Sequence, residues 1–165
     1  MNKQILAAGG IAVLIVGAAI SGILFSTRNN RVDLSGEVLK VRSHQMDAEH
    51  TVTLVDMRIH NPSTQQFVVS EVEVFVEDAD GKSAVAEIFA EPDAKRIAEY
   101  YPMLGGKDNP GLIRKTKIDS GKTTDYTIAV SAPMTDDRLA QRKRVRIVIH
   151  DVDGPVASIL EKRGS

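Results

Sequence analysis

Residues 50–82 read HTVTLVDMRIHNPSTQQFVVSEVEVFVEDADGK, and this stretch decides the class of fold. Apolar and polar residues alternate in it, which is typical of strands that bury one face. Proline lacks an amide donor, so Asn61 and Pro62 should end the first strand. Gly81 can supply the positive φ of a tight hairpin before a return strand. The stretch therefore predicts antiparallel strands over residues 50–60 and 67–77, followed by a hairpin.

The first of these strands changes its alternation part-way along. Val55, Met57 and Ile59 share one parity, whereas Val52 and Leu54 have the other. One extra residue in a strand reverses the face to which the following side chains point. We therefore expect a β-bulge near Leu54 or Val55.

Shorter strands and two brief helices are predicted around this stretch. Pro92 suits the first turn of a helix over residues 93–101, and Thr135 is a suitable N-cap for one to two turns that end at Arg142. Alternating segments predict further strands at residues 38–41, 84–89, 112–118, 126–130, 145–149 and 156–160. This order favours a mainly β fold, an antiparallel immunoglobulin-like β-sandwich with one or two short helices, over a parallel sheet with crossover helices.

The chain begins with an uncharged apolar segment, ILAAGGIAVLIVGAAISGILF at residues 5–25. As a helix it would be ~30 Å long, which is the thickness of the hydrocarbon layer of a bilayer. We predict an uncleaved transmembrane helix within an anchor at residues 1–27, a juxtamembrane linker at 28–34 and the β-sandwich domain at 35–165. The alternative is a signal peptide that is cleaved near Ala19 or Gly22.

Orientation and helix contacts follow from this anchor. Lys3 on one side and Arg28 and Arg31 on the other nearly balance, so charge does not set the orientation. The N-terminus is short and the remainder is a domain, which favours a cytoplasmic N-terminus and an extracytoplasmic domain, periplasmic if the host has two membranes. Small residues on shared ridges, at Gly17, Ser21 and Gly22, predict a helix–helix contact, although such residues are common in any membrane helix.

Composition excludes several kinds of chemistry. The 165 residues carry a formal net charge of −1 and no cysteine, so disulfides, thiolate metal sites and cysteine nucleophiles are absent. The near-neutral balance does not fit a nucleic-acid partner. One local basic run is expected to consist of solvated side chains, at Arg138, Arg142, Lys143, Arg144 and Arg146.

No catalytic, cofactor or metal motif is evident, so we predict a protein that is not an enzyme. The Asp-x-Asp-Gly segments at 78–81 and 151–154 lack the later ligands of a calcium loop and fit hairpin turns better. The spacing of the four histidines matches no zinc signature: His44, His50, His60 and His150. A Gly-x-Ser-x-Gly elbow and a Gly-rich phosphate loop before a helix are missing as well.

Amphipathic bulk gathers at one place, beside the loop MLGGKDNPG at residues 103–111. Tyr100, Tyr101, Met103 and Leu104 form this group, and tyrosine and methionine are enriched at protein interfaces. The group is therefore a candidate protein interface. The alternative is that these side chains plug one end of the sandwich.

Two segments carry a resemblance to known domains: residues 55–82, and residues 117–133, KIDSGKTTDYTIAVSAP. The first strand ends in Asn61 and Pro62, and turns follow at Gly81 and Gly121. This pattern resembles that of a broad bacterial group of membrane-tethered or exported immunoglobulin-like sandwiches. These domains are akin to late-embryogenesis-abundant type 2 (WHy-like) domains and related domains of unknown function. The resemblance implies a binding or packing module without catalysis, and it does not extend to residues 92–111.

The function expected from these patterns is that of a single-pass protein, held in the lipid bilayer through residues 5–25. Its extracytoplasmic β-sandwich would bind or brace a membrane or periplasmic protein, for example as an accessory subunit of a larger membrane complex. The alternative is a tethered carrier or sensor of a small ligand, which a cavity at the loop end of the sandwich would favour.

Overall fold

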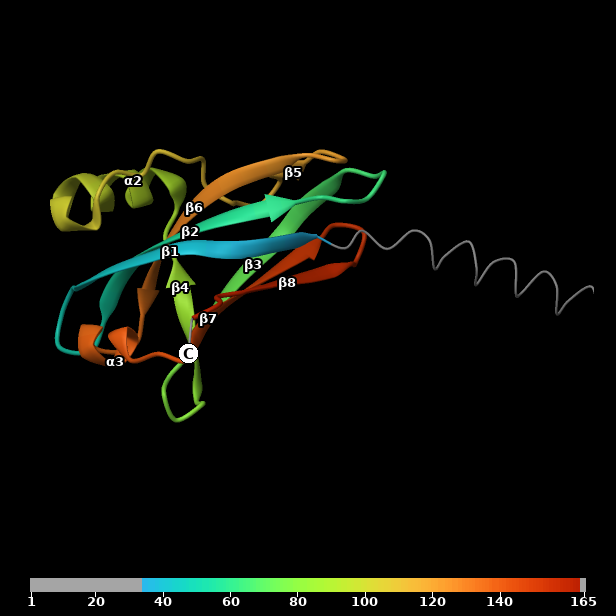
Figure 1. Cartoon of the computed structure of the whole chain (residues 1–165). Helices are drawn as coiled ribbons and strands as arrows, with labels where there is room; N and C mark the ends of the chain where they lie inside the picture. Colours follow the sequence, from blue (N-terminus) through green and yellow to red (C-terminus); the bar gives the residue numbers. More distant parts are fainter. Residues whose placement is uncertain (1–33, 164–165) are drawn as a thin grey trace, which may run out of the picture. The chain divides into compact units, whose positions relative to one another are not determined.

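Eight strands form the framework of the part of the chain that the computed structural model describes, residues 34–163 (Figure 1). They are β1 (Ser35–Gln45), β2 (Thr51–His60), β3 (Phe67–Glu77), β4 (Ser83–Ile88), β5 (Lys117–Ile118), β6 (Thr123–Ala132), β7 (Arg144–Asp151) and β8 (Val156–Leu160). The helical elements are α2 (Glu91–Tyr100), the 3-10 turn η1 (Pro102–Leu104) and α3 (Asp136–Ala140). The prediction of a mainly β fold with short helices is confirmed.

The predicted anchor at residues 5–25 and the helix contact through Gly17, Ser21 and Gly22 lie outside the described residues. Between residues 34 and 163, no helix combines the length and the apolar character that crossing a membrane requires.

The strands pair antiparallel in the order β1-β2-β6-β4-β3-β7-β8, and β5 pairs with β3. β4 joins two layers, because Ser83–Ala86 pair with β3 whereas Glu87 and Ile88 pair with β6. One apolar core lies between the layers and receives side chains from both. Its members include Val55, Met57, Ile59, Ile128 and Val130 from β2 and β6, and Val74, Val76, Ile147, Ile149 and Ile159 from β3, β7 and β8. The predicted antiparallel β-sandwich is thus a curled sheet folded over this core.

The predicted turns are confirmed, and polar side chains hold them. Asn61 is fully buried and its side-chain Nδ2 donates to the carbonyls of Gln65 (2.8 Å) and Ile118 (2.9 Å), which ties the end of β2 to β5. In the hairpin after β3, Gly81 has φ of 82° and the Lys82 amide donates to Asp78 Oδ1 at 2.9 Å. Gly154 has φ of 99° in the corresponding turn after β7.

The predicted bulge near Leu54 or Val55 is wrong. β2 and β6 stay in one register from Thr51 opposite Ala132 to His60 opposite Thr123. Instead, β2 is buried on both faces: Val55 faces the main core, and Leu54 belongs to a second apolar cluster. The change of parity in the sequence therefore marks the end of residues 51–55, over which both faces of the strand are buried, and no bulge is needed to explain it.

The predicted strand over residues 112–118 is also wrong in extent, since only Lys117 and Ile118 pair with β3. Lys115 has φ of 70° and the Thr116 amide donates to the Ile113 carbonyl at 3.0 Å, so the chain turns before it pairs. The predicted helix at Thr135 exists but ends at Ala140. Thr135 stands at its N-cap position without a capping side-chain bond.

Candidate functional site

The second apolar cluster lies between the outer face of β2 and β6 and the segment from α2 to η1. Val52, Leu54 and Ala129 come from the strands. Ala94, Ala98 and Leu104 come from α2 and η1, and Phe89, Ile97 and Tyr101 pack around them. We call residues 91–111, which comprise α2, η1 and the following loop, the cap. The cap is held by apolar contact on a face of the sheet that would otherwise meet solvent.

The four residues of the candidate interface divide into two pairs. Leu104 is 1% exposed and Tyr101 is partly buried, so both anchor the cap. Tyr100 is 77% exposed and Met103 is 71% exposed. The Tyr100 ring stands edge-on to the Tyr101 ring, with 4.8 Å between centroids, and Tyr101 also contacts the His44 ring at 5.1 Å. We call the exposed side chains of Tyr100 and Met103 the cap surface.

An arginine on β1 ties the cap to the sheet. Both carboxylate oxygens of Asp56 accept hydrogen bonds from Arg42 Nη2 at 2.9 Å. Arg42 Nη1 donates to the carbonyls of Leu104 and Gly106, the latter at 2.9 Å. Each of the two charged side chains is only 14% exposed. Arg42 therefore uses one planar group to join two strands and the start of the loop after η1.

Further polar contacts hold the rest of that loop. The ammonium group of Lys107 contacts Glu91 Oε1 at 2.5 Å and the Asn109 carbonyl at 3.0 Å, and this lysine side chain is only 3% exposed. The Thr127 hydroxyl donates to Asp56 Oδ1 at 2.5 Å and accepts from the Asn109 side-chain Nδ2 at 3.2 Å. Although residues 103–111 carry loop-forming residues, they are clamped to α2, β1, β2 and β6.

Sequence reasoning missed this clamp. Arg42, Asp56 and Thr127 stand on three strands, and nothing in the pattern around each residue shows that they meet. From sequence alone Lys107 is also expected at the surface, because lysine is rarely buried unless it has a charged partner. No local signal marks these residues, because Asp56 and Thr127 alternate with apolar neighbours as solvent-facing strand residues do.

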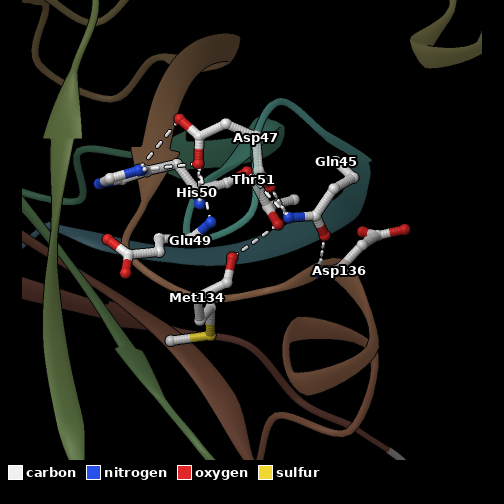
Figure 2. A network of polar contacts seen from close by, with 7 residues as sticks. All are labelled: Gln45, Asp47, Glu49, His50, Thr51, Met134 and Asp136. Atoms are coloured by element: carbon white, nitrogen blue, oxygen red, sulfur yellow. Dashed lines mark hydrogen bonds and ion pairs between the residues drawn. The ribbon is translucent and has the colours of Figure 1, made fainter.

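A second polar network joins the β1–β2 turn to α3 (Figure 2). Asp47 Oδ1 accepts from the amides of Glu49 (2.8 Å) and His50 (2.7 Å) and contacts the His50 ring. The Glu49 amide is the main cause of a lowered pKa at Asp47, to which His50 also contributes. Gln45 Oε1 accepts from the backbone amide of Asp136 at 2.6 Å, so a β1 side chain satisfies the first amide of α3. These contacts account for His50 as a turn residue.

The other histidines have separate partners. His60 contacts the Thr123 hydroxyl at 3.0 Å, His150 contacts Glu73 Oε2 at 3.0 Å, and His44 lies beside Tyr101. In the part of the chain that the structure describes, no three His, Cys, Asp or Glu side chains are grouped to hold a metal ion. The histidines therefore do not form a shared site there.

An open groove of about 670 Å³ lies where β3 and β4 diverge. Its walls include Val72, Phe89 and Ile113, with Glu71 and Arg114 among the charged residues. Glu71 and Arg114 are exposed, so this groove can hold a small molecule by apolar contact but does not bring together groups for acid–base catalysis.

The sequence matches no protein-family model and has no significant match among curated proteins. The structure is similar to the archaellum periplasmic stator protein FlaG from Sulfolobus acidocaldarius, with a TM-score of 0.36, 11% identity and coverage of 77% of this chain and 98% of FlaG. An uncharacterized β-sandwich protein from Clostridium difficile gives a TM-score of 0.34, 14% identity and coverage of 81% and 82%. The putative ApaA protein from Bordetella pertussis gives a TM-score of 0.36, 12% identity and coverage of 79% of this chain and 89% of ApaA. TM-scores this low do not establish a shared fold, and the resemblance to late-embryogenesis-abundant type 2 domains stays a prediction.

Proposed function

We propose that this protein is a membrane-anchored, non-catalytic module whose β-sandwich lies outside the cytoplasm and binds a protein partner through the cap surface. Residues 5–25 would hold it in the lipid bilayer with the N-terminus in the cytoplasm. The partner is a membrane or periplasmic protein, and the protein serves as an accessory subunit of that partner's complex.

One observation carries the proposal: Tyr100 and Met103 are held exposed on a segment that is clamped from beneath. Tyrosine and methionine are enriched at interfaces, and a rigid display lowers the conformational entropy that is lost on binding. The Arg42–Asp56 pair and buried Lys107 supply that rigidity. The partner surface would therefore offer a hollow for one aromatic and one flexible apolar side chain.

The anchor supplies a second proposed contact. Gly17, Ser21 and Gly22 would let a helix of the partner approach closely within the bilayer. Two weak contacts on one chain reinforce each other, because the first raises the effective concentration of the second.

Photo-crosslinking tests the cap surface. A photoreactive amino acid at position 100 or 103 of the full chain should give a discrete adduct in cells, which mass spectrometry identifies after extraction in mild detergent. The same probe at Val152, 56% exposed in the turn after β7, is the matched control. Equal adducts from positions 100, 103 and 152 would remove the cap surface from the proposal.

Membrane attachment is tested separately. The full chain should resist extraction by alkaline carbonate and dissolve in detergent. A reporter enzyme that is active only outside the cytoplasm, fused after Ser165, should be active. Carbonate extraction of the intact chain, or an inactive reporter, would contradict the anchor and its orientation.

A tethered carrier or sensor of a small ligand is the second candidate, and the groove between β3 and β4 favours it. Replacement of Val72 by Trp would fill this groove. If the groove is the functional site, that variant should lose the in vivo function while the Tyr100→Ala variant keeps it.

A further inference from the structure

The outward side chains of β4, β3, β7 and β8 form a second surface, on the layer opposite the cap; we call it the open face. It carries charged and apolar groups in solvent, and three of its apolar residues are well exposed: Val85 at 61%, Val156 at 53% and Leu160 at 39%. Exposed apolar side chains that cluster on one face are typical of an interaction surface.

Charges on the open face are sorted by strand. β3 presents Glu71, Glu73 and Glu77, and the neighbouring β7 presents Arg144, Arg146 and His150. Arg144 Nε lies 2.7 Å from Glu77 Oε2, and the His150 ring lies 3.0 Å from Glu73 Oε2. The face therefore has an acidic column beside a basic column, and two ion pairs already order four of its side chains.

Apolar groups lie in a row across the same strands. The register places Val85 beside Phe75, Phe75 beside Arg146, and Arg146 beside Leu160. The Arg146 guanidinium lies 4.2 Å from the centroid of the Phe75 ring, a distance that suits a cation–π contact. The row thus has an aliphatic residue at each end and a cation on an aromatic ring between them.

This pattern is complementary to itself under one two-fold rotation. An axis parallel to the strands, between β3 and β7 and in front of the face, places β3 over β7 of a second copy and β4 over β8. Glu77 then faces the second copy's Arg144, and Val85 faces the second copy's Leu160. An axis in front of the face but perpendicular to the strands would instead place the acidic columns over each other, which is repulsive.

We propose that the open face is the interface of a homodimer with the two-fold axis parallel to β3 and β7. Side chains that are already paired lose little freedom when a second copy docks. The cap lies on the other layer, so each copy keeps its cap surface free, and the dimer presents two of them. This inference does not depend on what the cap surface binds.

Charge exchange tests the interface in the full chain. The Glu77→Arg chain carries cations at both position 77 and position 144, and the Arg144→Glu chain carries anions at both positions. Each alone should self-associate at least about tenfold more weakly than the parent, because like charges then face each other, while an equimolar mixture should recover dimerisation. Sedimentation in mild detergent measures this, with Leu at positions 17, 21 and 22 in every chain so that the anchor does not contribute.

Because the chain has no native cysteine, crosslinking gives a second test that leaves the charges intact. A mixture of Val85→Cys and Leu160→Cys chains should be joined by a short bismaleimide. Neither chain alone should crosslink well, since equivalent positions are separated by three strand spacings, ~14 Å. Homotypic crosslinking of Val85→Cys as efficient as the mixed reaction, or a parent chain that stays monomeric at high concentration, would overturn the proposal. Tyr100→Ala should dimerise normally.

Discussion

The two outer faces of the β-sandwich differ in what covers them. On β2 and β6 the cap buries Leu54 and Ala129, so β2 is buried on both faces over residues 51–55. On β3 and β7 most outward positions hold charged residues that remain in contact with solvent. The comparison teaches that a break in the alternation of a strand can report a covered outer face, whereas regular alternation reports an open one.

The largest expected effect compares the same residue type on the two faces. Leu54→Ala removes a fully buried side chain beneath the cap and should lower the free energy of unfolding by about 2–5 kcal/mol. Leu160→Ala on the open face, where the side chain is 39% exposed, should cost less than about 1 kcal/mol in the dilute protein. Urea denaturation measures both. Equal losses would mean that the cap does not bury Leu54.

The next effect compares ion pairs on the two faces. Arg42→Met leaves Asp56 without its cation beneath the cap and should cost about 2–3 kcal/mol. Arg144→Met breaks the more exposed pair with Glu77 and should cost about 1 kcal/mol or less. Hydrogen exchange gives the sharper measurement, because Arg42→Met should release residues 103–111 while β3 and β7 stay protected. Unchanged protection of residues 103–111 would show that Arg42 does not clamp the cap.

Neighbouring tyrosines separate the stability of the cap from its binding. Tyr101→Ala should lower the free energy of unfolding by about 1–2 kcal/mol, since this ring packs on the second cluster. Tyr100→Ala should change it by less than about 0.5 kcal/mol while partner capture falls at least about tenfold. Thermal unfolding and quantitative co-purification from detergent report the two quantities. A Tyr100→Ala chain that captures the partner normally would count against the cap surface.

The smallest expected effect is on the acid limit of stability. The hydrogen bond from Arg58 lowers the pKa of Asp125 on β6. Burial alone would raise the pKa of Asp78 after β3, but bonds from the Lys82 amide and Arg138 lower it on balance. A carboxylate whose pKa is lowered by folding stabilises the folded state at any pH above its unfolded pKa of about 3.9. This stability is lost as the pH falls through the pKa of the folded state.

The melting temperature should therefore fall below about pH 4. Asp78→Asn and Asp125→Asn should each flatten that fall, and His60→Gln, which alters neither carboxylate, should not. A melting temperature of the parent chain that does not fall as the pH is lowered from about 5 to well below the unfolded pKa of about 3.9 would contradict both assignments.

Local sequence signals and long-range contacts explain which predictions succeeded. Pro92, Asn61, Gly81 and Gly154 act on the backbone within a few residues, and the turns and helix start that they predict are present. The strand over residues 112–118 failed because Lys115 adopts a positive φ that its residue type does not announce. Leu104 and Tyr101 point inward, and Tyr100 and Met103 outward, because residues 52–54 and 129 supply a sheet face on which the cap packs.

By itself the sequence determined where most of the strands and turns lie, because alternation and backbone restriction act between near neighbours. It also carries the prediction of an apolar anchor at residues 5–25. Only the tertiary structure decided that the cap covers β2 and β6, that Arg42 meets Asp56 and Gly106, and that acidic and basic columns stand side by side on β3 and β7. The physical reason is that side-chain partners across strands are set by register and layer packing, which bring together residues 14 to 77 positions apart.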